Sequence, residues 1–173
     1  FAYSVLVFCS IISLVWRIKI FEILSISSAK IGALFTFLTL VTGSIWGKPM
    51  WGTWWVWDAR LTSVAILFLL YLIIIFLNSS FEKNIVVREK IVAILIIIGS
   101  INLPIIKFSV DWWNTLHQPS SITLTSAPSI HYTMLVPLVV MLLGMTLYAF
   151  IIFIMKYKTE LMKIKIEKKR KSK

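Results

Sequence analysis

The residues best suited to bind a ligand gather in one short stretch, residues 46–60. Its sequence is W-G-K-P-M-W-G-T-W-W-V-W-D-A-R. A single tryptophan at a membrane surface needs no ligand to explain it, because its ring is apolar while its N–H is polar. Several in so short a stretch exceed what anchoring requires, and they predict a wide aromatic surface for a large planar ligand. Five of the eight tryptophans of the chain lie here: Trp46, Trp51, Trp54, Trp55 and Trp57.

The spacing of these tryptophans is compatible with a surface helix. Trp54 and Trp55 follow Trp51 by three and four positions, so a helix would place the three rings on one face. Trp57 and Asp58 would then turn toward another side. An interfacial helix that only anchors the loop is the simpler interpretation, but the local density of tryptophan favours ligand binding.

Charged side chains accompany the tryptophans. Asp58 and Arg60 could pair with each other or with the dipole of the next helix. Alternatively, Arg60 and Lys48 could neutralise carboxylates on a ligand. The sequence leaves these alternatives open.

A second candidate segment has the sequence D-W-W-N-T-L-H-Q-P, residues 111–119. A neutral imidazole is a good ligand for haem iron, and His117 has Trp112 and Trp113 within helical reach. A lone histidine is usually an ordinary surface residue, but the neighbouring tryptophans favour a ligand here. His131 could be a second axial ligand and Met134 could also ligate haem iron, but an interfacial histidine and a packing methionine are the simpler interpretations. No nucleophile–histidine–acid set, glycine-rich phosphate loop or HExxH motif supports hydrolytic chemistry.

The composition indicates a membrane protein. Of the 173 residues, 59% are hydrophobic and 14% charged, whereas soluble domains have about 25% charged residues. The mean hydropathy is +0.91. The net charge of +11 comes mostly from loops and the C-terminal tail, which favours the anionic lipid surface over nucleic acid as a partner. The single cysteine, Cys9, excludes an internal disulfide.

Apolar segments alternate with polar ones along the chain. A bilayer core of about 30 Å needs about 20 helical residues. We therefore predict an all-α polytopic transmembrane bundle over residues 1–155, with a tryptophan-rich loop at 46–60, an outer loop at 107–133 and a basic tail at 156–173. Because Phe1 opens inside an apolar run, we expect the first span to be cut short. The five predicted spans are residues 1–16, 31–45, 61–77, 91–106 and 134–155.

The distribution of basic residues predicts the orientation. The segments 17–30, 78–90 and 156–173 hold fifteen of the eighteen lysines and arginines, and the other side holds Lys48, Arg60 and Lys107. Basic residues in short loops stay in the cytoplasm. We therefore expect the tail inside, and both candidate segments outside the cytoplasm.

Two long motifs carry a resemblance to a known family. T-G-S-I-W-G-K-P-M-W-G-T-W-W-V-W-D at 42–58, followed by A-R-L-T-S, resembles the tryptophan-rich WWD signature of haem-handling membrane proteins. N-L-P-I-I-K-F-S-V-D-W-W-N-T-L-H-Q-P at 102–119 narrows the resemblance to the cytochrome c maturation protein C family. The match covers nearly the whole chain and is weakest in the tail and the first span.

The resemblance implies what the protein does and where. It implies six transmembrane helices in the intact protein, in the bacterial inner membrane or the mitochondrial inner membrane, with the tryptophan-rich segment on the periplasmic side. It implies no catalysis: such a protein presents haem b and hands it to a haem chaperone, cytochrome c maturation protein E. Its other partners are the ABC transporter subunits and a small membrane subunit of the same system.

The resemblance also implies two axial histidines, of which His117 matches the second. The first is expected upstream of Phe1. Two alternatives remain: a haem lyase-type enzyme, which is a larger protein with more spans, and a structural membrane subunit whose tryptophans contact only lipid or a protein neighbour. The predicted haem-binding side chains are His117, which ligates the iron, and Trp51, Trp54, Trp55, Trp57, Asp58, Arg60, Trp112 and Trp113.

Overall fold

All the regular secondary structure in the part of the chain that the structure describes is helical. The computed structural model describes residues 1–80, 85–118, 121–122 and 127–171 and contains no strand there, which confirms the all-α prediction. The helices are α1 (Ala2–Trp16), α2 (Lys19–Trp51), α3 (Ala59–Ser80), α4 (Ile85–Gly99), α5 (Asn102–Trp112) and α6 (Tyr132–Lys171).

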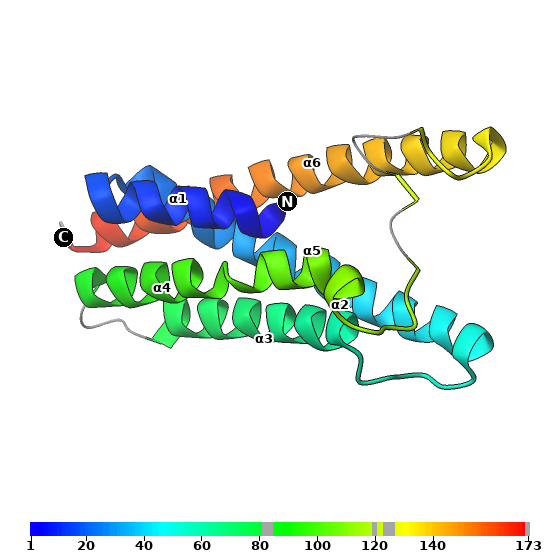
Figure 1. Cartoon of the computed structure of the whole chain (residues 1–173). Coiled ribbons are helices and arrows are strands. Elements are labelled where there is room, and N and C mark those ends of the chain that lie inside the picture. Colours follow the sequence, from blue (N-terminus) through cyan, green and yellow to red (C-terminus); the bar gives the residue numbers. More distant parts are fainter. Residues whose placement is uncertain (81–84, 119–120, 123–126, 172–173) are drawn as a thin grey trace.

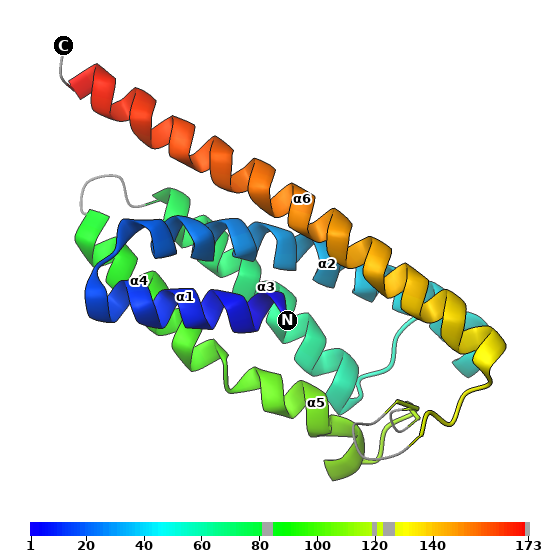
Figure 2. The same ribbon diagram turned by 90° about the horizontal axis from the view of Figure 1, so that it is seen from above.

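The first four helices form a bundle that positions the rest. α1 packs against α2 and α4, while α3 packs against α2, α4 and α5 (Figure 1). α6 contacts α2 and runs obliquely across the bundle, as Figure 2 shows from above. The tryptophan-rich end of α2, the start of α3, the end of α5 and the start of α6 all lie at the same end of the molecule (Figure 1). We call this the outer end, and the opposite end the inner end.

Within the described residues, four helical segments are long and apolar enough to cross a membrane. They are Lys19–Trp51, Ala59–Ser79, Val86–Trp112 (α4 with α5) and Tyr132–Ile166. The predicted first span corresponds to α1, which is apolar but has 15 residues and falls short of the roughly 20 that a bilayer core requires. Four of the five predicted spans are thus confirmed by length and composition.

The polar turn predicted over residues 17–30 is much shorter in the structure. The chain reverses at Arg17, whose φ of 54° is left-handed and whose N–H donates to the Ser13 carbonyl, and α2 starts at Lys19. α2 then continues for 33 residues to Trp51. The first part of the predicted 46–60 loop is therefore helical. The predicted tail also continues α6 without interruption to Lys171.

The hydrophobic core lies in the inner half of the bundle and is built around two tyrosines. Tyr3 and Tyr71 are almost fully buried, and their rings meet edge to face at 5.3 Å between centroids. The Tyr3 hydroxyl donates to the Ile96 carbonyl oxygen at 3.1 Å. A Cβ at Gly32 would lie 2.2 Å from Tyr71 Cζ, so only glycine lets α2 approach this ring. The other core residues are Leu6, Ile26, Ala29, Ala33, Ile74, Val92 and Ile96.

One buried hydrogen bond positions α5 beside α3. The Asn102 side chain donates through Nδ2 to the Ser63 carbonyl at 2.8 Å, and both residues are buried. A buried amide that donates to a main-chain carbonyl fixes the two helices relative to each other, because leaving the amide donor unpaired in the same place would be costly. This hydrogen bond therefore helps to place the segment that follows α5, residues 113–118, beside the start of α3.

Candidate functional site

A glycine divides the tryptophan-rich stretch into a helical and a non-helical part. Gly52 has a left-handed φ of 77° and its N–H donates to the Lys48 carbonyl, which ends α2. Trp54 and Trp55 lie beyond this cap, in non-helical chain. The prediction that they share a helical face with Trp51 is therefore wrong, because the helix stops between them.

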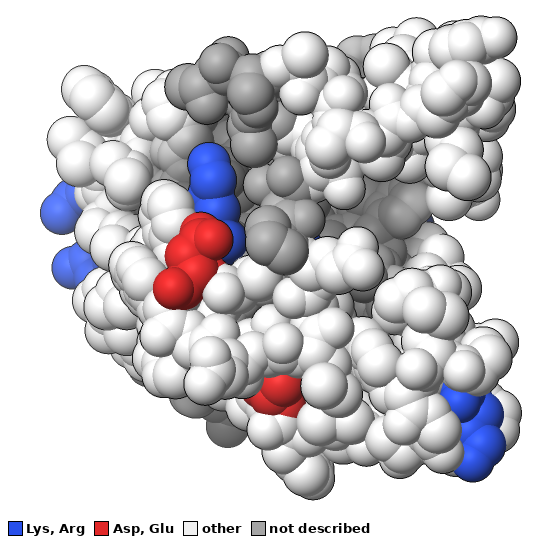
Figure 3. Space-filling view, turned by 45° about the vertical axis from the view of Figure 1, so that its right-hand side comes forward, with Lys and Arg blue, Asp and Glu red and all other residues white. Residues whose placement is uncertain are grey.

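The tryptophan rings nevertheless form an exposed aromatic surface. Trp46 and Trp51 pack edge to face at 5.3 Å, and Trp55 and Trp57 do so at 5.5 Å. Trp57 is 80% exposed and Trp54 is 57% exposed. Exposed apolar area of this kind marks a binding or membrane surface. Figure 3 turns this end toward the viewer and shows a face with few charged side chains, of which one basic and one acidic group lie side by side.

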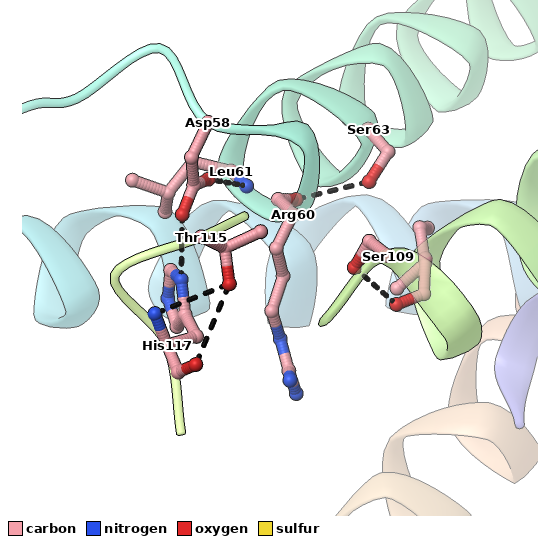
Figure 4. Close-up of polar contacts among 8 residues, drawn as sticks. Asp58, Arg60, Leu61, Ser63, Ser109, Thr115 and His117 are labelled. Carbon is pink, nitrogen blue, oxygen red and sulfur yellow. Dashed lines mark hydrogen bonds and ion pairs between the residues drawn. The ribbon is translucent and has the colours of Figure 1, made fainter. Parts of the chain in front are cut away.

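His117 joins the second candidate segment to this surface. Its ring packs edge to face against Trp51 at 4.9 Å between centroids. Its Nδ1 lies 2.7 Å from Oδ2 of Asp58, and Figure 4 shows the imidazole directed at this carboxylate. Because a carboxylate only accepts hydrogen bonds, Nδ1–H is the donor, and in the neutral imidazole Nε2 then keeps its lone pair. The histidine is thus held between the end of α2 and the start of α3.

Asp58 caps α3 and does not pair with Arg60. Its Oδ1 accepts the Leu61 backbone N–H at 2.7 Å, the usual role of an aspartate before a helix. The alternatives for Asp58 were an ion pair with Arg60 and an interaction with the start of the next helix. The second is confirmed. Arg60 extends away from the carboxylate in Figure 4, and within the described ranges it forms no ion pair.

The remaining predicted tryptophans form a separate group. Trp112 stacks on Phe108 at 5.3 Å, and Trp113 meets Trp112 edge-on at 5.9 Å. Both are more than half exposed. α5 ends at Trp112 and Trp113 is extended, so the helical reach expected between Trp113 and His117 is absent. Among the described residues, no ring contact links this pair to His117.

Comparison with known proteins decides the family. The family described as Heme exporter protein C matches residues 1–172. The chain belongs to this family. It is 53% identical over 163 residues to Heme exporter protein C of Haemophilus influenzae, an alignment that covers 93% of this chain and 65% of the relative. With Heme exporter protein C of Escherichia coli the identity is 51% over 119 residues, covering 69% of this chain and 48% of the relative.

A mitochondrial relative extends the comparison. A cytochrome c biosynthesis protein of Marchantia polymorpha mitochondria is 53% identical over 136 residues, covering 79% of this chain and 56% of the relative. The chain spans about half to two-thirds of the length of these curated relatives. The resemblance inferred from the two sequence motifs is confirmed.

Three polar side chains support the site but were not predicted from the sequence. They are Ser44, Thr53 and Thr115. The Ser44 hydroxyl of α2 donates to the Trp54 carbonyl at 2.7 Å and holds the non-helical segment against the helix. The Thr53 hydroxyl donates to the Trp55 carbonyl at 3.1 Å, and Thr115 Oγ1 accepts the His117 N–H at 3.3 Å. Both threonines could have been found from the sequence, because each lies two residues before a candidate site residue. This is the spacing at which hydroxyl side chains form local turns.

The polar groups of Trp55 and His131 differ in their surroundings. The Nε1–H of Trp55 is buried without an acceptor in the described part of the chain, a situation that normally costs free energy. His131 is exposed, and its Nδ1 lies 2.8 Å from its neighbour Thr133 Oγ1, which agrees with the interpretation of an interfacial histidine.

Proposed function

We propose that this chain binds haem on its exposed tryptophan surface and presents it during cytochrome c maturation. The observation that carries the proposal is the position of His117, packed on Trp51 and hydrogen-bonded through Nδ1 to Asp58. This arrangement leaves Nε2, the nitrogen with a lone pair, as the iron ligand. Haem is the proposed cargo because the relatives are named as haem exporters.

The tryptophans supply the contacts to the porphyrin. Each good aromatic contact contributes about 1 kcal/mol beyond the burial of area. Trp51, Trp54, Trp55 and Trp57 form the proposed stacking surface, and Trp112 with Trp113 is assigned to its margin. The relatives are longer than this chain, and we assign the second axial histidine to the part of the family sequence outside residues 1–173.

Basic side chains at the outer end fit the propionates of haem. Arg60 forms no ion pair among the described residues, so its guanidinium is available to a carboxylate. Lys48 Nζ lies 5.8 Å from the Trp54 ring centroid, at the edge of the stacking surface. Lys107, the third basic residue of this side, is assigned the same role.

An open surface suits a protein that must release its ligand. The proposed acceptor is the haem chaperone of the system, protein E, with the ABC transporter subunits and the small membrane subunit as further partners. The protein presents and transfers haem without forming a covalent bond, so we do not propose an enzyme. The charge distribution supports an outer end outside the cytoplasm, in the bacterial or mitochondrial inner membrane, with the C-terminus inside.

Replacement of the proposed iron ligand tests this function. His117→Gly in the full-length protein, purified with its chaperone, is expected to lose the Soret band, and added imidazole should restore it by filling the space of the side chain. His131→Gly is the matched control and should retain haem. An unchanged Soret band in His117→Gly would show that the ligand is misassigned. A complex that never carries haem would favour the structural-subunit alternative.

A reporter fused after residue 173 tests the orientation. A fluorescent protein that matures only in the cytoplasm should be bright there, and a periplasmic reporter should be inactive. The opposite pattern would place the outer end in the cytoplasm and contradict the proposed delivery.

A further inference from the structure

Both oxygens of the Asp58 carboxylate have a defined partner. Oδ1 accepts the Leu61 N–H and Oδ2 accepts the His117 Nδ1–H, each at 2.7 Å. The Asp58 side chain is only 6% exposed, whereas that of His117 is 21% exposed. A carboxylate held on one side by a helix end cannot follow the imidazole if it moves. The fixed partner of this pair is therefore Asp58, and the imidazole is oriented by it.

We propose that Asp58 is the positioning residue of His117. This inference rests on the proposed function, and it assigns Asp58 a role other than contact with haem. The carboxylate holds the proton on Nδ1, which keeps Nε2 free for iron, and it makes the imidazole a stronger donor. Carboxylate partners of metal-binding histidines act in this way in general, and their loss typically lowers metal affinity 10- to 100-fold.

The surroundings of the ring leave Asp58 as the group that selects the tautomer. Trp51 contacts the imidazole through its ring at 4.9 Å, which restricts its position without distinguishing the two nitrogens. Thr115 Oγ1 bonds only the backbone of His117, where it accepts the N–H and donates to the carbonyl. His131 offers an internal contrast, since its Nδ1 accepts the backbone N–H of Thr133 at 3.4 Å and faces the hydroxyl of the same threonine.

The competing explanation is that Asp58 only caps α3. Two substitutions separate these roles. Asparagine and serine are both good caps, so Asp58→Asn and Asp58→Ser should preserve the start of α3. Asn presents an amide that can donate to Nδ1, which moves the ring proton to Nε2, while Ser offers His117 no carboxylate. Asp111→Asn is the matched control, because Asp111 is an exposed acid at the end of α5.

The first readout needs no haem. Histidine-selective ¹⁵N labelling gives the imidazole signals, and the variants His117→Asn and His131→Asn assign the two that belong to residues 1–173. In the full-length haem-free protein we expect Nδ1 of His117 to carry the proton, and in Asp58→Asn we expect the proton on Nε2. A His117 ring with the same tautomer in Asp58→Asn and in the original protein would overturn the inference.

The second readout is haem retention by the full-length protein with its chaperone. Asp58→Asn and Asp58→Ser should retain 10- to 100-fold less haem, with an unchanged thermal midpoint and a more positive iron reduction potential for the residual pigment. Asp111→Asn should match the original protein. If haem retention is unchanged, or if its loss is accompanied by a lower thermal midpoint that accounts for it, Asp58 acts only as a cap. Either result would overturn the inference. A normal Soret band in His117→Gly would instead overturn the proposed function.

Discussion

The inner and outer ends of the molecule use aromatic residues in opposite ways. At the inner end Tyr3 and Tyr71 are 1% and 2% exposed and fit against glycines. At the outer end Trp54 and Trp57 are 57% and 80% exposed and contact few neighbours. The difference indicates that the inner half provides stability, while the outer rings are left available for a ligand. Substitutions at the two ends should therefore affect different measurements.

The largest effect on stability is expected where α2 meets Tyr71. Gly32→Leu places a side chain where even a Cβ would lie 2.2 Å from the tyrosine ring, and it should cost about 3 kcal/mol. Thermal unfolding in detergent measures the change. Gly43→Leu in the same helix is the control, since nothing lies within 4 Å of a Cβ there. Equal midpoints for the two variants would contradict the description of the core.

A smaller loss of stability is expected when the hydrogen bond that joins α5 to α3 is removed. Asn102→Ala removes the hydrogen bond to the Ser63 carbonyl and the packed amide, and should cost about 2 kcal/mol because a buried hydrogen bond is lost and a cavity replaces the side chain. It should also weaken haem retention, since α5 carries the His117 segment. Asn78→Ala, outside this contact, serves as the control. Normal haem retention together with lowered stability would show that α5 does not position the site.

A still smaller effect is expected from a single hydroxyl in the core. Tyr3→Phe removes the hydrogen bond to the Ile96 carbonyl and should cost about 1 kcal/mol, with no change in haem retention. Tyr132→Phe, at an exposed tyrosine, should leave the thermal midpoint unchanged. A loss of haem in Tyr3→Phe would contradict the separation between the two ends.

The smallest change in stability is expected at the exposed tryptophans. Trp54→Leu with Trp57→Leu should alter the free energy of unfolding by less than about 0.5 kcal/mol. Haem retention should nevertheless fall about tenfold or more, because two aromatic contacts are lost. Trp16→Leu, an exposed tryptophan of the inner end, is the control. If the double variant and this control retain haem equally, the outer tryptophans do not form the binding surface.

The sequence predicted the helical fold better than the boundaries between its elements. Apolar segments of sufficient length identify helices without tertiary information. The polar stretch around Glu22 and Lys30 was predicted as a loop, yet it lies within α2. Glu22 pairs with Arg88 at 3.4 Å, and Lys30 pairs with Glu160 of α6. Partners supplied by distant helices explain why these charges are tolerated there, and a local pattern cannot show them.

The candidate site shows the same limit. Clustered tryptophans and a histidine are visible in the sequence, but the contact between Asp58 and His117 joins residues 59 positions apart. It depends on Gly52 ending α2 and on Asn102 placing α5. These are tertiary consequences, so the sequence left open whether Asp58 pairs with Arg60.

The length of α2 has a consequence for the acceptor of the ligand. At 1.5 Å per residue, its 33 residues measure about 50 Å, compared with about 30 Å for the hydrocarbon core of a bilayer. If the inner end of α2 lies at one surface of the bilayer, this length is sufficient to carry Trp46 and Trp51 to the lipid headgroups of the other surface or beyond. We expect a water-soluble acceptor to reach them without burying any of its own surface in lipid.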